Sequence, residues 1–554
     1  MILAATAFAT LLPVACYVFI GLRRRSWPTS LDDYFIYGRK VNANDFANTT
    51  VGYSLQMAAL FLFADWGIRY GFGAFWVPVF WGLGFGLLYL AIPRLGQFLS
   101  QNWTIHGYLH NAFSSRAVQV MASLATIIGL WGTMMAEIDY ATSVYQPFFT
   151  DPKSLYVLGM VFLLFGFIYI TYGGYKAEVN TERIQVPIAY ATLLLVVLIM
   201  IQNVYAKGFA SRFWMLNGLL LLCFLIMIKA KADTVPGHRF ADRQIFIPIV
   251  GIGLQLLLII VSLSSGWSPS TGPGLEVYNA GSFGTQLRAQ GTLGLVSLFF
   301  ANALWQFADV SSWQRISSVK LTTGTHQFAQ IQRGIRRVML ESPVSWIFGA
   351  ILGMTLNYSG FLHKSEDPSV ALTNFAAAIV TGKTQLALLG GFTWFIFPVL
   401  VAAVIAIMLS TVDALISAIS FTSYHDLPPY GKSKSLNSAR MWTFLITLLG
   451  GVLYYGLRFI SHIDIQTALY AFYSSQLSLF APILGTLLTK RLCKTAAFSA
   501  IAAGIATAFV TAFFVANKPQ YAVTPPLFAL LVSSTMYILV STWCLLFNKS
   551  GSTT

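Results

Sequence analysis

The chain has 554 residues, of which 56% are hydrophobic and 10% are charged, and its mean hydropathy is +0.68. This composition excludes an ordinary soluble domain and predicts a polytopic membrane protein. Lys and Arg outnumber Asp and Glu by 34 to 19. These basic residues lie between apolar runs and do not cluster on a soluble surface, so nucleic acid is excluded as the partner.

Apolar runs long enough to cross about 30 Å of hydrocarbon recur along the chain. Arg23, Arg24 and Arg25 follow the first run and no basic residue precedes it, which predicts an N-terminus outside and a cytoplasmic C-terminus. We therefore expect a multi-pass protein of the plasma (inner) membrane, with lipid head groups as partners of its basic clusters. The fifteen predicted spans are 2–22, 47–72, 75–97, 117–143, 154–172, 184–205, 211–228, 247–266, 289–313, 340–361, 386–422, 441–461, 464–489, 495–515 and 525–547.

Ionisable side chains within spans are functional candidates because a buried charge is costly in hydrocarbon. Asp65 and Arg69 are four residues apart, so they share a helix face and can neutralise each other as a strut. Glu137 and Asp139 are two apart, so at most one readily points into a central cavity. Asp309 and Asp413 complete the set.

Two spans carry residues that interrupt helices: Tyr70-Gly71-Phe72-Gly73 in the second and Phe397-Pro398 in the eleventh. Transporters use such breaks to present backbone groups to ions and substrates at the membrane midplane. We expect both spans to be discontinuous.

Other chemistry finds little support in the sequence. The cysteines, at 16, 223, 493 and 544, show no CxxC spacing, so we expect neither a disulfide framework nor a zinc site. His106 and His110 lack a third metal ligand and predict a loop helix. Without a GxxxxGK[ST] loop, ATP-driven pumping is unsupported and any coupling must come from an ion gradient. No enzyme activity and no obligate protein partner are indicated.

Several motifs together resemble the sodium/solute symporter family, which includes proline, sialic acid and sugar carriers. The resemblance covers most of the chain, and its most specific part is Ile407-Met-Leu-Ser-Thr-Val-Asp413. The other matching segments are Asp32–Arg39, Gly173–Ala177 with Thr181–Gln185, Asn302–Gln306 with Trp313–Arg315, and Leu479–Gly485.

The resemblance implies an all-α LeuT-type fold, in which two five-helix repeats of opposite orientation are joined by extra helices. We expect an extra helix and loop at 1–46, the first repeat at 47–205, and the second repeat at 289–489. An inserted helix pair and outer loop would occupy 206–288, with further helices at 490–554. No role for the inserted pair follows from the sequence.

The resemblance also implies a sodium site. Its ligands map onto Ser54, Met57, Ile407, Ser410 and Thr411, with Glu182 as a transient ligand where the family has Asp. Sodium is a hard cation that prefers oxygen ligands, which suits hydroxyls and freed carbonyls. Alone, Ser410 and Thr411 would more often bond to their own helix, and Glu182 would be a charge at a helix start.

The family registers place the solute between the first, third and sixth core helices. The predicted residues are Gln56, Phe61, Glu137, Asp139, Asn302, Trp305 and Gln306. An unpaired carboxylate there would favour an amine, whereas a cavity close to neutral would admit zwitterions or sugars. In the structural alternative, these side chains only pack and hydrogen-bond between neighbouring helices and do not contact a solute.

These observations predict a secondary transporter that imports a small polar organic solute together with sodium, by alternating access. One alternative is a membrane sensor built on the same fold. Another is a proton-coupled carrier in which Asp65, Glu137 and Asp139 relay protons.

Overall fold

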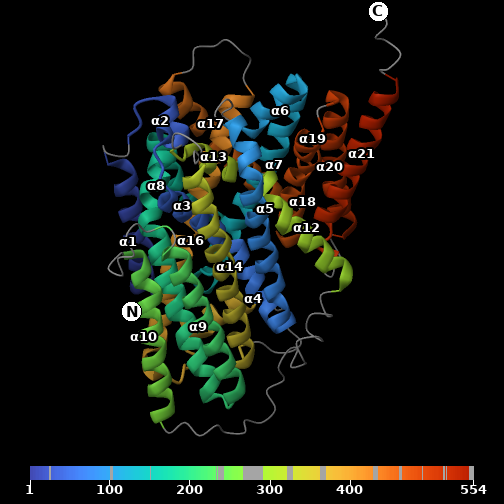
Figure 1. Cartoon of the computed structure of the whole chain (residues 1–554). Helices are drawn as coiled ribbons and strands as arrows, with labels where there is room; N and C mark the ends of the chain where they lie inside the picture. Colours follow the sequence, from blue (N-terminus) through green and yellow to red (C-terminus); the bar gives the residue numbers. More distant parts are fainter. Residues whose placement is uncertain are drawn as a thin grey trace, which may run out of the picture.

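The computed structural model describes the chain except residues 24–26, 100–103, 150, 233, 235–242, 266–290, 321–327, 362–369, 428–434, 461–464, 490, 516–517, 519–520 and 548–554. Arg24 and Arg25, used above for orientation, lie outside the described residues. The described part is a bundle of helices, in which α1 (Ile2–Leu22) lies at the left of Figure 1 and α21 (Pro525–Phe547) at the right.

The helices follow the predicted order. Helix α1 (Ile2–Leu22) is followed by the short α2 (Leu31–Ile36) and by α3 (Ala43–Leu55), α4 (Met57–Tyr70), α5 (Trp76–Leu99), α6 (Ile105–Phe113), α7 (Arg116–Ser143) and α8 (Pro152–Ala206). The inserted pair is α9 (Ala210–Ala232) and α10 (Arg243–Ser264). Then come α12 (Thr292–Ala308), α13 (Val310–Ser318), α14 (Ala329–Tyr358), α15 (Ala371–Val380), α16 (Ile396–Asp426), α17 (Leu436–Ile460), α18 (Ile465–Leu477), α19 (Phe480–Leu488), α20 (Lys494–Val515) and α21 (Pro525–Phe547).

Within the described residues, 12 helical segments are long and apolar enough to cross a membrane, or up to 13 if the bent pair α12–α13 is one span. Two of them, Met57–Arg94 and Lys153–Ala206, have 38 and 54 residues, well beyond the ~20 that a span needs. Each contains a glycine of positive φ, Gly71 (52°) and Gly174 (58°). Divided at these glycines, they supply the remaining spans of the fifteen predicted, and the chain is a multi-pass membrane protein.

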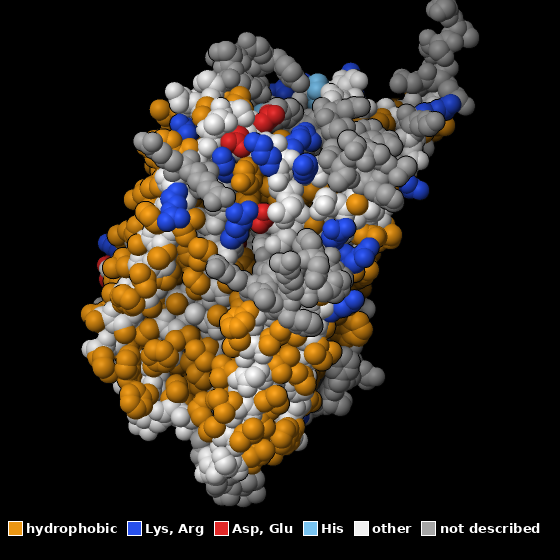
Figure 2. Space-filling view, turned by 60° about the vertical axis from the view of Figure 1, so that its left-hand side comes forward, with side chains coloured by type: hydrophobic (Ala, Val, Ile, Leu, Met, Phe, Trp, Pro, Cys, Tyr) orange, Lys and Arg blue, Asp and Glu red, His pale blue; other side chains and the backbone are white. Residues whose placement is uncertain are grey.

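The bundle is held together by long-range packing of α8 on α16, of α14 on α4 and α5, and of α7 on α18. Helices α1 and α10 lie at one edge of the view and α20 and α21 at the other (Figure 1). Figure 2 shows a broad hydrophobic zone across the lower part of one face, with Lys and Arg side chains gathered above it. This distribution matches a lipid-facing belt below a polar, basic end.

Two spans are broken in the middle of the bundle. Between α3 and α4 the chain turns at Gln56, whose φ of 29° is rare for a residue with a side chain. Between α12 and α13 it bends by 42° at Asp309. The second span is therefore discontinuous as predicted, although its break falls at Gln56 and Gly71 only ends α4.

The break predicted at Phe397-Pro398 is wrong. Helix α16 is continuous from Ile396 to Asp426, and Pro398 lies in its first turn, where a missing N–H costs nothing. The break in the ninth span was missed because Asp309 was considered only as an intramembrane charge. Its carboxylate in fact caps α13 by accepting hydrogen bonds from the backbone N–H groups of Ser311 and Ser312, both at 3.1 Å.

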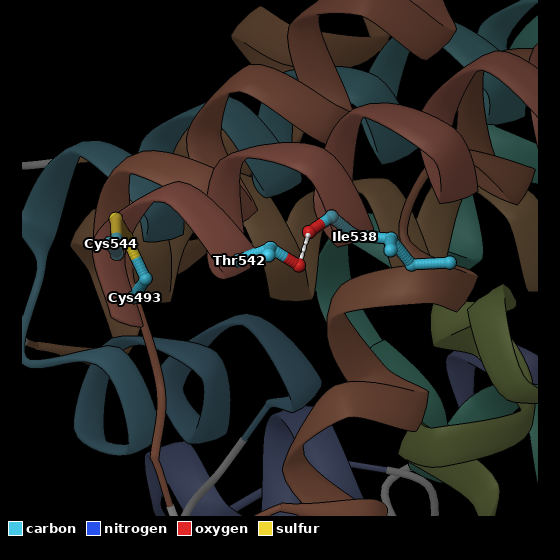
Figure 3. Close-up of a disulfide and its surroundings, with 4 residues drawn as sticks. All are labelled: Cys493, Ile538, Thr542 and Cys544. Atoms are coloured by element: carbon cyan, nitrogen blue, oxygen red, sulfur yellow. Dashed lines mark hydrogen bonds between the residues drawn. A yellow bond between two sulfur atoms is a disulfide. The ribbon is translucent and has the colours of Figure 1, made fainter. Parts of the chain in front are cut away.

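The expectation that no disulfide forms is also wrong. Cys493 and Cys544 are joined by a disulfide that links the start of α20 to the last turn of α21 (Figure 3). The two residues are 51 positions apart, so no local spacing announces the bond. They meet because α20 and α21 pack along each other, with a Cα–Cα distance of 6.5 Å at this end.

Candidate functional site

The break at Gln56 exposes the N-terminus of α4, and Glu137 of α7 caps it. The backbone N–H of Met57 donates to Glu137 Oε2 at 2.6 Å, and that of Ala58 donates to Oε1 at 3.1 Å. Glu137 is fully buried. A carboxylate at the positive end of a helix satisfies otherwise unpaired N–H groups and the helix dipole. Glu137 therefore stabilises the broken helix.

Beside this break lies a hollow of about 610 Å³, including its open mouth. Its described lining comes from α4, α5, α7, α12, α14 and α18: Gln56, Ala58, Ala59, Leu62, Phe63, Trp66, Val77, Trp81, Thr133, Ala301, Asn302, Trp305, Trp346, Leu469, Tyr470 and Tyr473.

Aromatic rings form two walls of this cavity. On one wall, Trp346 stacks on Phe63 and lies 4.5 Å from Trp81, measured between ring centroids. Both indole N–H groups of this wall are already used, because Trp346 donates to the Ser54 carbonyl at 2.6 Å and Trp81 donates to Ser342 Oγ at 2.8 Å. This wall therefore offers a ligand apolar ring surface.

On the other wall, Trp305 and Tyr473 are stacked, with centroids 3.6 Å apart and planes within 8°. The Tyr473 hydroxyl donates to the Ala301 carbonyl at 3.2 Å, which fixes its ring. The buried Trp305 Nε1 has no hydrogen-bond partner. The side-chain N–H of Asn302 donates to the Leu298 carbonyl at 2.7 Å. Asn302 Oδ1 takes no part in the hydrogen bonds of this wall named here.

The structure brings three of the predicted solute residues to the cavity, namely Gln56, Asn302 and Trp305. It does not bring the other four to the described lining. Phe61 packs on Tyr140, with ring centroids 5.0 Å apart, and Gln306 accepts a hydrogen bond from Ser312 Oγ at 3.2 Å. Glu137 caps α4, and Asp139, two residues on, lies on a different face of α7.

Several residues that line the cavity were not predicted from the sequence. Trp66, Trp81, Trp346, Tyr470 and Tyr473 lie in apolar spans, where an aromatic residue most often packs against its neighbours. No local pattern separates a cavity-lining ring from a packing ring, because their difference lies in what faces them across the bundle.

Two of the predicted sodium residues, Ser410 of α16 and Glu182 of α8, are in direct contact beside Gly52 of α3. Ser410 Oγ donates to Glu182 Oε1 at 2.7 Å, and Glu182 Oε2 is buried without a hydrogen-bond partner. Thr411 Oγ1 donates to the Ile407 carbonyl of its own helix at 3.2 Å, which is the intrahelical bond of the alternative interpretation. The Ser54 carbonyl accepts a hydrogen bond from Trp346 Nε1 at 2.6 Å, and the backbone N–H of Met57 donates to Glu137.

Gly52 makes this junction possible. A Cβ on Gly52 would collide with Glu182 Oε2 and would lie 2.7 Å from Ser410 Oγ. The absence of a side chain leaves three elements close enough to share oxygens. A hard cation suits this donor set of hydroxyl, carbonyl and one free carboxylate oxygen.

Further buried charges surround the junction. Asp413 accepts a hydrogen bond from the Tyr169 hydroxyl at 2.5 Å, and Arg315 of α13 pairs with Glu178 at 3.0 Å. Glu178 and Glu182 interact electrostatically with this guanidinium, and Asp413 interacts with both glutamates. In such a neighbourhood a bound cation is favoured by charge balance.

An ion pair and two hydrogen bonds tie α3 to its neighbours α8 and α14. Arg183 of α8 forms two bonds to Asp45, at 2.9 and 2.7 Å. Arg337 of α14 donates to Asn44 and Asn48, at 2.5 and 2.6 Å. Any opening toward the upper end must separate these contacts. Lower in the bundle, Arg69 pairs with Asp65 at 2.8 Å, which confirms their predicted shared face.

No family model and no curated protein matches the chain. Among solved structures it is similar to a Na+-coupled sialic acid symporter in a substrate-bound outward-open state, at 16% identity, covering 97% of this chain and 98% of that one with a TM-score of 0.61. It also matches Mhp1, a nucleobase-cation-symport-1 family transporter in a closed conformation with bromovinylhydantoin bound, at 12% identity over 94% and 96% of the chains. The TM-score of that second match is 0.35, so it carries no argument here.

The first likeness shows the fold. The chain therefore has the all-helical LeuT-type architecture predicted from its motifs, an architecture of membrane transporters.

Proposed function

We propose that this protein is a sodium-coupled secondary transporter that imports a small polar organic solute by alternating access. The observation that carries the proposal is the pair of broken helices, α3–α4 and α12–α13, which flank a cavity lined by aromatic rings and two amide side chains. Broken helices at the midplane of two repeats are how transporters of this fold build their sites.

Sodium is proposed as the coupling ion because Ser410 and Glu182 bring a hydroxyl and a carboxylate together between α16 and α8, and the hydroxyl of Thr411 and the carbonyl of Ile407 follow on the same helix as Ser410. The proton-coupled alternative is less favoured at two of its three candidate residues, Asp65 and Glu137. Asp65 pairs with Arg69, and both oxygens of Glu137 hold backbone N–H groups.

The proposed orientation follows the positive-inside rule, with the basic upper end in the cytoplasm. The cavity would then face outward, and the ties of α3 to Arg183 and Arg337 would close the cytoplasmic side. A C-terminal green fluorescent protein fusion should fluoresce, because that reporter folds in the cytoplasm but not after export. A dark, full-length fusion in the membrane would contradict this orientation.

Uptake into proteoliposomes tests the function. A panel of labelled solutes should include at least one whose accumulation requires an inward sodium gradient and persists when the pH gradient is collapsed. Accumulation driven by a pH gradient alone would favour the proton carrier, and no accumulation of any solute would favour the sensor.

The sodium site is tested by replacing Ser410 and Thr411 together with Ala. Loss of two oxygen ligands should raise the sodium concentration for half-maximal uptake by about tenfold or more, which corresponds to ~1.4 kcal/mol. Thr422→Ala, which removes a buried hydroxyl about three turns further along α16, is the control. Unchanged sodium dependence in the folded double variant would remove these residues from the site.

A further inference from the structure

The chemistry of the cavity narrows the solute beyond the proposed function, on which this inference rests. The described lining residues include no Asp, Glu, Lys, Arg or His. Their polar groups are the amides of Gln56 and Asn302, the Thr133 hydroxyl, two tyrosine hydroxyls and indole N–H groups. Those groups recognise a ligand by neutral hydrogen bonds.

Both helix N-termini created by the breaks are already filled by the protein's own carboxylates. Glu137 accepts the free N–H groups of Met57 and Ala58 at the start of α4. Asp309 accepts those of Ser311 and Ser312 at the start of α13. A free helix N-terminus is the natural seat for the carboxylate of a solute. With both N-termini occupied and no basic side chain among the described lining residues, that lining offers an anionic group no charged partner.

The described lining also offers no carboxylate to pair with a cationic solute. Both oxygens of Glu137 are held by backbone N–H groups, and the Asp309 carboxylate also accepts the hydroxyls of Ser311 and Ser312, at 2.7 and 2.9 Å. No carboxylate among the described lining residues faces the hollow. Ring faces alone would have to balance the charge, and they attract a cation far less than a carboxylate does.

What the cavity does offer is ring surface with a polar edge. The indole N–H groups of Trp81 and Trp346 donate hydrogen bonds within the protein, so these two rings present an apolar wall to the cavity. On the opposite wall, Trp305 Nε1 is a buried donor without a partner, next to the amide of Asn302. A buried polar group without a partner is costly, so a ligand acceptor at this point is favoured.

We infer that the solute is an uncharged ring compound whose face lies against the aromatic walls and whose edge both donates and accepts hydrogen bonds, the chemistry shared by neutral monosaccharides and nucleobases. It is neither a carboxylate nor a quaternary amine. This departs from the sialic acid symporter with the similar fold, since sialic acid carries a carboxylate.

Equilibrium binding to the purified full-length protein in sodium-containing buffer tests the inference. The probes are a set of neutral monosaccharides, the neutral nucleobases, N-acetylneuraminate, L-proline and choline. A neutral sugar or a nucleobase should bind saturably, and which of the two binds identifies the source of the ring. Tighter binding of N-acetylneuraminate, proline or choline, or no binding of any uncharged probe, would overturn the inference.

The donor is tested with Trp305→Phe, which keeps the ring and removes the N–H. The affinity for the bound probe should fall about five- to tenfold, as for one hydrogen bond. Trp131→Phe is the matched control, because Trp131 Nε1 is also buried without a partner but Trp131 is not among the lining residues. Equal losses in both variants would contradict the assignment. If Trp305→Phe does not fold, Asn302→Ala should weaken the same probe, and unchanged affinity there would count against the site.

Binding and uptake separate this inference from the proposed function. Sodium-driven uptake of a charged solute would overturn the uncharged class and leave the transporter intact. Saturable binding of an uncharged ring compound without uptake under any gradient would overturn the transporter proposal and leave the uncharged class of ligand intact.

Discussion

Gly52 lies where three helices share the oxygens of the proposed sodium site. Its Cα faces Glu182 of α8 and Ser410 of α16 so closely that a methyl group would displace both. Overpacking of a buried site forces side chains from their preferred positions at a cost of about 1–3 kcal/mol. The glycine therefore matters for the positions of the oxygens.

We predict that Gly52→Ala raises the sodium concentration for half-maximal uptake about tenfold or more, because it moves Glu182 and Ser410 apart. Sodium titration of uptake in proteoliposomes measures this effect. Gly218→Ala in α9 is the control, since a Cβ there meets no atom within 4 Å. Equal behaviour of both variants and the parent would show that the junction does not hold the ion.

At the same scale, Glu137 supports α4 rather than contacting the solute. We predict that Glu137→Gln lowers the free energy of unfolding by about 1–3 kcal/mol, because an amide has one acceptor oxygen for two buried N–H groups. Unfolding titrations in mixed micelles measure the loss. Asp151→Asn, at the exposed N-cap of α8, is the control and should change little, since Asn caps helices as well as Asp. A loss as large at Asp151 would argue against a special role for Glu137.

At the scale of elements, the inserted pair is joined to the core by buried charges. Lys231 in the last turn of α9 pairs with Glu341 of α14 at 2.6 Å, and Arg337 pairs with the same carboxylate at 2.7 Å. Arg337 also reaches Asn44 and Asn48 of α3. The insertion thus supports the arginine that holds the first broken helix, which gives it a structural role.

This arrangement predicts unequal effects of removing one charge. Glu341→Gln removes the carboxylate that Lys231 and Arg337 share and should destabilise the protein by about 3–5 kcal/mol. Lys231→Met leaves the Arg337–Glu341 pair intact and should cost clearly less. Thermal unfolding of the two purified variants measures the difference. A larger loss for Lys231→Met would contradict the proposed balance of charges.

At the scale of the whole molecule, the bond between Cys493 and Cys544 ties the last two helices together at the upper end (Figure 3). In the proposed orientation this end faces the cytoplasm, where thiols are kept reduced. The bond would then form after extraction into an oxidising buffer.

We predict that in protein purified without reductant an alkylating reagent modifies Cys16 but neither Cys493 nor Cys544, and that reductant makes both reactive. Mass spectrometry of the peptides measures this. The oxidised protein should exceed Cys544→Ser in unfolding free energy by about 2–4 kcal/mol, because a cross-link restricts the unfolded chain. Cys16→Ser is the control. Modification of both residues without reductant would show that the thiols do not pair.

Much of this architecture could be predicted from the sequence. The apolar runs give nearly all of the spans, because hydrocarbon admits only helices whose backbone groups are paired internally. The motifs around Ser410 and Asn302 led to the LeuT-type fold, and the spacing of Asp65 and Arg69 predicted their ion pair. Each of these signals is local, carried by neighbours in the chain.

Only the tertiary structure decided how the site is used. Glu137 became a cap because the break at Gln56 brings the start of α4 to α7, two elements about 80 residues apart. The aromatic walls, the cradle at Gly52 and the pairing of Cys493 with Cys544 likewise depend on facing helices. Composition and periodicity decide which stretches of chain become helices in a membrane. Which side chains meet is decided by the packing of those helices, because its contacts join residues that no local pattern relates.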